Sequence, residues 1–297
     1  LYACRGGLKE VVMFDIGMPG GQITQSSEIE NYPGIKEVKS GLDFMQEWLP
    51  QAEHFGLKFD MNGVSKIAKT DNGHFILTMM DGTTKEAMSV IIATGSVPKK
   101  AGFDGESQYF GRGVSTCATC DGFFYRGKEV VVMGGGDTAL EEAHYLAKIC
   151  KKVYLVHRRE TFRAAPSSVE RVKHTENIEL ILNASVKQVT GDNMGVNTVI
   201  VEQNGELRYL EVPGIFIFVG RDVNNGSLKA DDGNFICEVV ESGEIKVDLK
   251  MRTSVAGLFA AGDVRSEAAR QVVCAAADGA VAALEAISYV DHFKGGH

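Results

Sequence analysis

Two cysteines spaced for redox chemistry stand near the middle of this 297-residue chain. Cys117 and Cys120 are separated by two small residues, and two thiols at this spacing can close a tight disulfide. The same spacing supplies half of a structural zinc site, which needs four ligands. The remaining cysteines are Cys4, Cys150, Cys237 and Cys274. They form no second C-x-x-C pair and no close Cys/His cluster. We therefore predict a redox-active disulfide and no metal site.

A glycine-rich turn follows the dithiol at the position of a dinucleotide-binding motif. Gly134, Gly136 and Ala139 match the pattern G-x-G-x-x-A, after a strand predicted over 129–133 and before a helix predicted over 138–149. Small residues at such a turn permit close approach of a pyrophosphate to the helix N-terminus. The alternative interpretation is an ordinary turn without a ligand. The strand before it and the helix after it favour the dinucleotide-binding motif over this alternative. The residues expected to bind the dinucleotide are Gly134, Gly136, Asp137 and Thr138.

A basic cluster indicates which dinucleotide this turn binds. Where an NAD enzyme presents an acid to the ribose, this chain has basic residues instead. These are His157, Arg158, Arg159 and Arg163. Guanidinium groups suit a 2′-phosphate, so we predict NADPH rather than NADH. A solvated basic patch is the alternative, but an isolated basic cluster in a chain of net charge −8 favours an anionic ligand.

Glycines and acidic residues also stand where other apolar strands end. Asp15 closes a strand predicted over 11–15, where an acid commonly holds a ribose; a simple turn residue is the alternative. Asp263 follows Gly262 beyond an apolar run and can accept hydrogen bonds from ligand hydroxyls. The glycines of the loop 20–22 allow close backbone approach to a ligand. A second ligand-binding unit is therefore expected.

Composition narrows the class of protein. The net charge of −8 argues against nucleic acid as the main partner, because a phosphate backbone requires a basic face. We find no apolar run that approaches the length of a membrane span and no secretory pattern, so we predict a cytoplasmic protein that does not bind membranes. Six cysteines in a chain of this length do not indicate a disulfide scaffold.

The order of the predicted elements indicates an α/β fold with two nucleotide-binding domains. An apolar strand over 214–220 ends the unit that carries the dithiol. A strand over 257–263 and an Ala-rich helix over 271–289 then return to the first domain. We predict two Rossmann-like, three-layer domains, one inserted into the other. Their expected bounds are 1–104 with 226–297 for the first domain and 105–225 for the inserted one.

The N-terminal segment lacks the start of a dinucleotide-binding unit. Residues 1–7 are typical of a helix end with a glycine stop, but no strand with G-x-G-x-x-G precedes them. We therefore expect a truncated N-terminus. Further along, an amphipathic helix is predicted over 44–55 and a small antiparallel hairpin around 75–82.

These motifs, in this order, resemble the low-molecular-weight, bacterial-type thioredoxin reductases of the flavoprotein disulfide reductase family. The resemblance covers essentially the whole chain. It is carried by the segment 115–124, Gly20-Gly21-Gln22, Ala93-Thr94-Gly95, His157-Arg158-Arg159 with Arg163, and Ala261-Gly262-Asp263 followed by Gln271-Val272. It implies that FAD binds the first domain and NADPH the inserted one, that the protein is a homodimer, and that thioredoxin is the substrate.

The resemblance also implies roles for individual residues. Cys120 would lie near the isoalloxazine, and Cys117 would attack the disulfide of the protein substrate. Asp121 is the candidate general acid, with a turn residue before glycine as the alternative. Asp263 would contact the ribityl chain. The residues expected to bind FAD are Asp15, Gly20, Gly21, Gln22, Asn31, Thr94, Gly95, Gly262, Asp263, Gln271 and Val272.

The dithiol and the NADPH site share one domain, yet both must reach the flavin held by the other. We therefore expect one domain to rotate against the other about the crossing segments 95–105 and 220–226. Two other functions stay open. One is a reductase that supplies a peroxidase through another small dithiol protein. The other is a non-enzymatic NADPH-binding redox sensor without FAD, against which the glycines and acids of the first domain argue.

Overall fold

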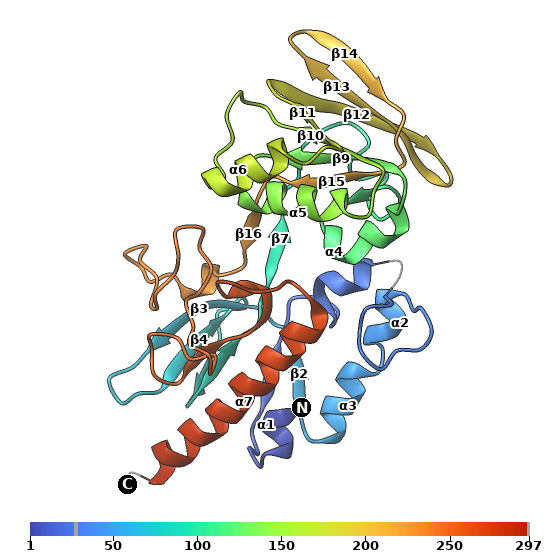
Figure 1. Ribbon diagram of the computed structural model, residues 1–297. Helices are drawn as coiled ribbons and strands as arrows, with labels where there is room; N and C mark the ends of the chain where they lie inside the picture. Colours follow the sequence, from blue (N-terminus) through green and yellow to red (C-terminus); the bar gives the residue numbers. More distant parts are fainter. Residues whose placement is uncertain (27–28, 296–297) are drawn as a thin grey trace. The chain divides into compact units, whose positions relative to one another are not determined.

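The computed structural model describes residues 1–26 and 29–295 of the chain. The chain divides into two compact units, each built from helices and strands (Figure 1). Unit 1 comprises Leu1–Val97 and Asp222–His297, and unit 2 comprises Pro98–Arg221. The two connections between the units are strands β7 (Ser96–Pro98) and β16 (Arg221–Val223), which pair with each other.

Unit 2 contains a five-stranded parallel sheet in the order β11-β10-β9-β15-β8. A separate antiparallel sheet has the order β12-β13-β14. The elements of unit 2 are β8 (Val114–Ser115), α4 (Ala118–Asp121), η2 (Gly122–Tyr125), β9 (Glu129–Gly134), α5 (Asp137–Ala147), β10 (Lys152–Val156), α6 (Pro166–Lys173), β11 (Ile178–Ile181), β12 (Ala184–Asp192), β13 (Gly195–Gln203), β14 (Glu206–Leu210) and β15 (Ile215–Phe218).

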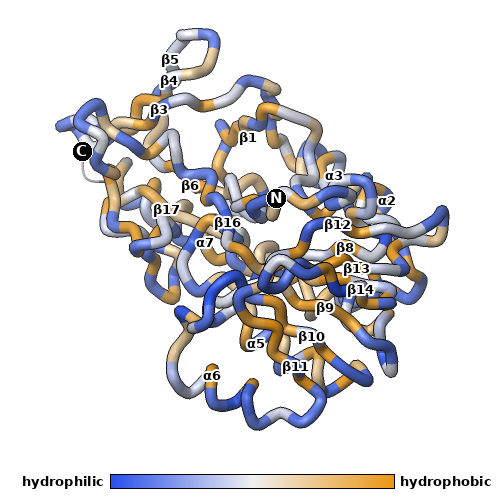
Figure 2. Tube along the Cα trace, turned by 90° about the horizontal axis from the view of Figure 1, so that it is seen from above, coloured by the Kyte–Doolittle hydropathy of each residue, from blue (hydrophilic) through white to orange (hydrophobic). Residues whose placement is uncertain are grey.

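The parallel sheet of unit 2 is buried on both faces. Val130 and Val132 of β9 belong to a core shared with Leu140 and other residues of α5, whereas Val131 belongs to a core shared with Val199 of β13. Because successive side chains of a strand point to opposite faces, this alternation makes three layers: helices, parallel sheet and antiparallel sheet. Figure 2 shows the resulting run of hydrophobic residues along β9 and β10.

Unit 1 is assembled from smaller sheets. Strands β1 and β2 pair in parallel, as do β6 and β17, and β3-β4-β5 form an antiparallel sheet. The elements of unit 1 are α1 (Tyr2–Arg5), β1 (Val12–Phe14), η1 (Gly21–Gln25), α2 (Gly41–Met45), α3 (Trp48–His54), β2 (Lys58–Asp60), β3 (Val64–Lys69), β4 (Phe75–Met79), β5 (Thr84–Ala87), β6 (Val90–Ile92), η3 (Gly226–Leu228), β17 (Leu258–Ala260), η4 (Gly262–Val264) and α7 (Val272–Gly295).

Two local predictions for unit 1 had different outcomes. The hairpin expected around 75–82 is confirmed, because β4 pairs with β5 through the turn between them. The single helix expected over 44–55 is wrong, since α2 ends at Met45 and α3 begins at Trp48. Pro50 lies in the first turn of α3, where the missing N–H of proline costs nothing, whereas a continuous helix would lose a hydrogen bond there.

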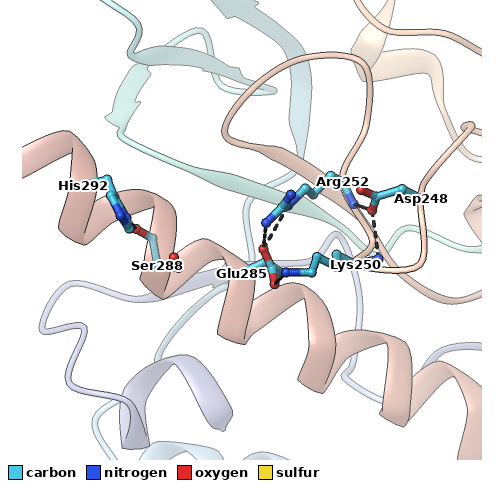
Figure 3. Close-up of polar contacts among 6 residues, drawn as sticks. All are labelled: Asp248, Lys250, Arg252, Glu285, Ser288 and His292. Carbon is cyan, nitrogen blue, oxygen red and sulfur yellow. Dashed lines mark hydrogen bonds and ion pairs between the residues drawn. The ribbon is translucent and has the colours of Figure 1, made fainter.

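Helix α7 is long and apolar enough to cross a membrane by length and composition alone, over Val272–Phe293. This corrects the expectation that no apolar run approaches that length. Within the structure 22 % of the apolar stretch of α7 is buried, and the helix packs against β17 through Ala282 and Ala286. Figure 3 shows that its Glu285 also pairs with Arg252, so a charged residue of the helix has a partner within unit 1.

Candidate active site and cofactor-binding elements

The dithiol lies at the start of α4 in unit 2. Cys117 and Cys120 form a disulfide with their Cα atoms 5.3 Å apart, and both residues are half-buried. Cys117 is the N-cap of α4, and its Sγ accepts a hydrogen bond from the backbone N–H of Cys120 at 3.2 Å. The Oγ1 of Thr119 lies 3.5 Å from the same sulfur. These donors would stabilise a thiolate on Cys117 once the disulfide is opened.

Asp121, at the end of α4, is connected to the dithiol through a buried serine. The Oγ of Ser115 donates a hydrogen bond to Oδ2 of Asp121 at 2.6 Å and accepts one from the backbone N–H of Cys117 at 3.1 Å. Burial, together with the nearby charge of Asp121, raises the pKa of Tyr125 to about 12. In the sequence, Ser115 stands out only as part of a motif. Its contact with Asp121, six residues away, forms only because the chain turns between β8 and α4.

The glycine turn of unit 2 joins β9 to α5. A Cβ on Gly134 would lie 2.5 Å from Cβ of Ala139, so the helix and the strand pack closely at this point. A Cβ on Gly135 would lie between 2.0 and 2.6 Å from three ring atoms of His157. Among the described atoms, none lies within 4 Å of a Cβ placed on Gly136. The turn thus leaves room at the N-terminus of α5 for an anionic group such as a pyrophosphate.

His157 lies beneath this turn and is only 6 % exposed. Its ring stacks on Phe162 with centroids 5.1 Å apart, and its Nε2 lies 3.1 Å from the backbone O of Thr161. Burial lowers the pKa of His157, and the neighbouring arginines lower it further against the opposing hydrogen bond with Thr161. The imidazole is therefore neutral and packed, in contrast to three side chains that are exposed: Arg158, Arg159 and Arg163.

The loop that carries these arginines is fastened to the glycine turn. The backbone N–H of Arg163 donates to the O of Gly135 at 2.8 Å. The Oδ1 of Asp137 accepts hydrogen bonds from the backbone N–H of Ala165 at 2.7 Å and from Oγ of Ser168 at 3.4 Å. Asp137 therefore joins the start of α5 to the start of α6. Thr138, the other predicted residue at this position, is exposed.

The structure brings two of the predicted residues of unit 1 together. Asn31 Nδ2 donates a hydrogen bond to Oε1 of Gln271 at 3.3 Å, although 240 positions separate them in the sequence. Gln271 directly precedes Val272, the first residue of α7. Asp15, which follows β1, accepts a hydrogen bond from the backbone N–H of Gly17 at 3.1 Å. Gly20 is the N-cap of η1, and Gly21 and Gln22 are its first two residues, so this part of the predicted loop is a 3-10 helix.

Thr94 and Gly95 are held by the returning chain at Asn224. The Oγ1 of Thr94 donates to the backbone O of Asn224, and Nδ2 of Asn224 donates to the backbone O of Thr94 at 2.9 Å. Gly95 has a φ of +68°, and within the described part of the chain no atom lies within 4 Å of a Cβ added there. Glycine is the residue that adopts this φ without strain, so the backbone is open to a ligand here.

Gly262 and Asp263 begin η4, and a buried acid on α7 holds this turn. Asp278 is 8 % exposed and its Oδ2 accepts a hydrogen bond from the backbone N–H of Gly262 at 3.1 Å. Arg265 donates to both carboxylate oxygens, from Nε at 2.7 Å and from Nη2 at 3.0 Å. The motifs in the sequence did not single out Asp278, although an acid inside an Ala-rich helix is a signal for a buried pair.

No metal centre is formed by the residues that the structure describes: among them, no group of three or more His, Cys, Asp or Glu residues could hold a metal ion.

The comparisons with known proteins agree over nearly the whole chain. The family model described as pyridine nucleotide-disulphide oxidoreductase matches residues 2–279. The thioredoxin reductase of Helicobacter pylori is 58 % identical over 98 % of this chain and 94 % of its own length, and that of Treponema pallidum is 40 % identical over 98 % and 92 %. The crystal structure of thioredoxin reductase from Streptococcus pyogenes has a TM-score of 0.90 at 36 % identity, and covers 98 % of this chain and 93 % of its own.

Proposed function

The chain belongs to the pyridine nucleotide-disulphide oxidoreductases and is a low-molecular-weight thioredoxin reductase, so we propose that Cys117 and Cys120 carry electrons from NADPH and FAD to thioredoxin. The observation that carries this proposal is the disulfide at the start of α4, in the same unit as the glycine turn of β9 and α5. The proposed site for the electron donor NADPH and the redox disulfide thus belong to the same unit, which is built around one parallel sheet.

Unit 2 is the NADPH-binding domain in this proposal, and it is inserted into the FAD-binding domain. The space beside Gly136 accommodates the pyrophosphate, and the exposed guanidinium groups of Arg158, Arg159 and Arg163 bind the 2′-phosphate. We assign His157 to the support of the turn rather than to the phosphate, because its ring is buried against Gly135. The other residues predicted from the sequence to bind NADPH are Gly134, Asp137 and Thr138.

Unit 1 is the FAD-binding domain. Its residues fit such a ligand, since the Asn31–Gln271 pair and the open backbone at Gly95 offer polar groups without a Cβ in the way. FAD, when bound, would supply the chemistry that links hydride transfer from NADPH to the delivery of two electrons to a disulfide. The residues that we propose to hold it are Asp15, Gly20, Gly21, Gln22, Asn31, Thr94, Gly95, Gly262, Asp263, Gln271 and Val272.

The two cysteines have different roles in disulfide exchange. The thiolate of Cys117 attacks one sulfur of the thioredoxin disulfide, which forms a mixed disulfide and releases a thioredoxin thiolate. The sulfur of Cys120 then attacks Cys117, so the Cys117–Cys120 disulfide re-forms and the second thioredoxin thiolate leaves. Asp121 delivers a proton to a departing thiolate. The hydrogen bond from the N–H of Cys120 to Sγ of Cys117 favours Cys117 as the attacking thiolate.

Three further features belong to the proposal. Motion of the two domains about β7 and β16 would let the dithiol and NADPH use the flavin in turn. The protein is a homodimer, and it works in the cytoplasm. A reductase that acts on another small dithiol protein is the second candidate, which a direct comparison of substrates distinguishes.

The visible spectrum of the full-length protein tests the proposal. Anaerobic NADPH should bleach a flavin band, and oxidised thioredoxin should restore it. The Cys120→Ser variant should bleach but fail to pass electrons on. A protein that stays colourless when FAD is supplied would contradict the proposal and favour an NADPH-binding sensor. Faster reoxidation by another dithiol protein than by thioredoxin would favour the second candidate.

A further inference from the structure

One buried hydroxyl joins the proposed proton donor to the backbone of the dithiol. Ser115 is 5 % exposed and ends β8, where its pairing with Phe216 of β15 fixes its position in the parallel sheet. Its Oγ lies 2.6 Å from Oδ2 of Asp121, 3.1 Å from the backbone N of Cys117 and 3.3 Å from the backbone O of Cys117. The carboxylate and both backbone groups of Cys117 thus meet at one oxygen.

The single proton of this hydroxyl limits which bonds can form at once. Ser115 has one O–H to donate, and the shorter distance directs it to the ionised carboxylate of Asp121. When Asp121 is protonated, its own O–H can donate to Oγ of Ser115, and the serine proton can turn to the O of Cys117. Ser115 therefore has a partner in both protonation states of Asp121, and the direction of its O–H follows the proton.

We propose that Ser115 is the positioning residue for proton transfer at the dithiol, because its hydroxyl holds Asp121 against the Cys117 turn and favours the ionised carboxylate. This inference rests on the proposed role of Asp121 as the proton donor. A hydrogen bond donated to a carboxylate stabilises its charged form, so losing the bond favours the protonated acid. Loss of the Ser115 hydroxyl also removes one hydrogen bond that ties the Asp121 side chain to the dithiol turn.

Other titratable groups also lie near Asp121. On α4 they are the two cysteines themselves. From η2, Tyr125 faces Asp121, and burial raises its pKa to about 12, so it stays neutral in the assay range. Helix α5 packs on α4 and brings Tyr145 beside Gly122. Beyond Tyr125, burial raises the pKa of Cys150 to about 11, so this thiol stays neutral as well.

The pH profile of a single turnover from the reduced dithiol to oxidised thioredoxin tests the inference. A general acid acts while protonated, so the rate falls as the pH rises through the pKa of the acid. In Ser115→Ala this fall should move to higher pH by about one pH unit, and the maximal rate should drop by about three- to tenfold. Ser115→Thr keeps the hydroxyl and should restore the position of the fall.

Two controls separate the possible failures. Asp121→Asn should abolish the fall in rate, and Ser115→Ala in that background should cause no further change in the profile. If Asp121→Asn keeps the fall, the proposed role of Asp121 is wrong. If Asp121→Asn abolishes it but Ser115→Ala leaves its position unchanged, the role of Ser115 is wrong. The pH profile of the rate at which the reduced thiols are alkylated provides a readout without turnover. If this alkylation profile is the same in Ser115→Ala and wild type, the inference is also overturned.

Discussion

The substitution Gly135→Ala tests the packing beneath the glycine turn. The added Cβ would lie 2.0 to 2.6 Å from ring atoms of His157, so the ring must move by more than about 1 Å to reach ordinary contact distances. The ring stacks on Phe162 and is bound to the O of Thr161, so it has little room to move. Overpacking of this kind costs about 1–3 kcal/mol, and loss of the hydrogen bond adds about 1 kcal/mol.

A destabilisation of about 2–4 kcal/mol should lower the Tm of unit 2 by about 6–12 °C. Gly136→Ala is the matched control, because within the described residues no atom lies within 4 Å of its added Cβ. As an N-cap change it should cost at most about 1 kcal/mol. We expect the control to lower the Tm by no more than about 3 °C. It should raise the KM for NADPH by about tenfold or more, which is about 1.4 kcal/mol of binding.

Thermal unfolding without nucleotide and NADPH oxidation kinetics measure the two effects separately. The double variant Gly135→Ala/His157→Ala should be less destabilised than the sum of the single variants, because removal of the ring relieves the contact. A Tm of Gly135→Ala within about 2 °C of wild type, on the order of the error in these magnitudes, would refute the reasoning. So would additive effects in the double variant.

The remaining predictions concern the buried acid of α7 and the buried thiols. Asp278→Ala removes the carboxylate partner of Arg265 and leaves the N–H of Gly262 unsatisfied, so it should cost on the order of 3 kcal/mol and lower the flavin content per chain. Asp278→Asn, which keeps an acceptor for Gly262, should cost less; equal Tm values for Asp278→Ala and wild type would contradict this account. Burial raises the pKa of Cys150 and of Cys237 to about 11 each, so the fold favours the neutral thiols. This stabilisation is complete below the unfolded thiol pKa of about 8.5 and is lost as the pH rises through about 11. Between these two pKa values each thiol loses about 1.4 kcal/mol of stabilisation for each pH unit. Urea unfolding should therefore show stability falling from about pH 9 to about pH 11, and Cys150→Ala should reduce this slope; a slope unchanged by that substitution would refute the assignment.

Local spacing and residue chemistry were sufficient to predict the functional motifs. The disulfide needs only two cysteines at the correct separation, and the glycine turn needs a buried strand before it and a helix after it. The strand expected over 129–133 is β9, and the helix expected over 138–149 is α5 within two residues at each end. Because these features depend on neighbours in the chain, the sequence by itself contained them, and the family membership that they indicated is confirmed.

Secondary structure that depends on irregularities was harder to predict. The antiparallel sheet of unit 2 was missed because β12 has a register shift between Val186 and Gln188, which breaks the alternation of apolar residues that marks a strand. The break between α2 and α3 was missed because the spacing of apolar residues continues across it. The helical hydrogen bonds stop after Met45 and start again with α3, whose first turn contains Pro50.

Contacts between distant residues were decided only by the tertiary structure. The sequence places His157 beside three arginines, but the fold turns its ring beneath Gly135 while their side chains stay exposed. Asn31 meets Gln271 from 240 positions away, and Asp278 reaches Gly262 from α7. The direction of a side chain and the partner of a buried charge follow from the packing of whole elements, because a polar group that leaves water must find its hydrogen bonds wherever the fold brings donors and acceptors together.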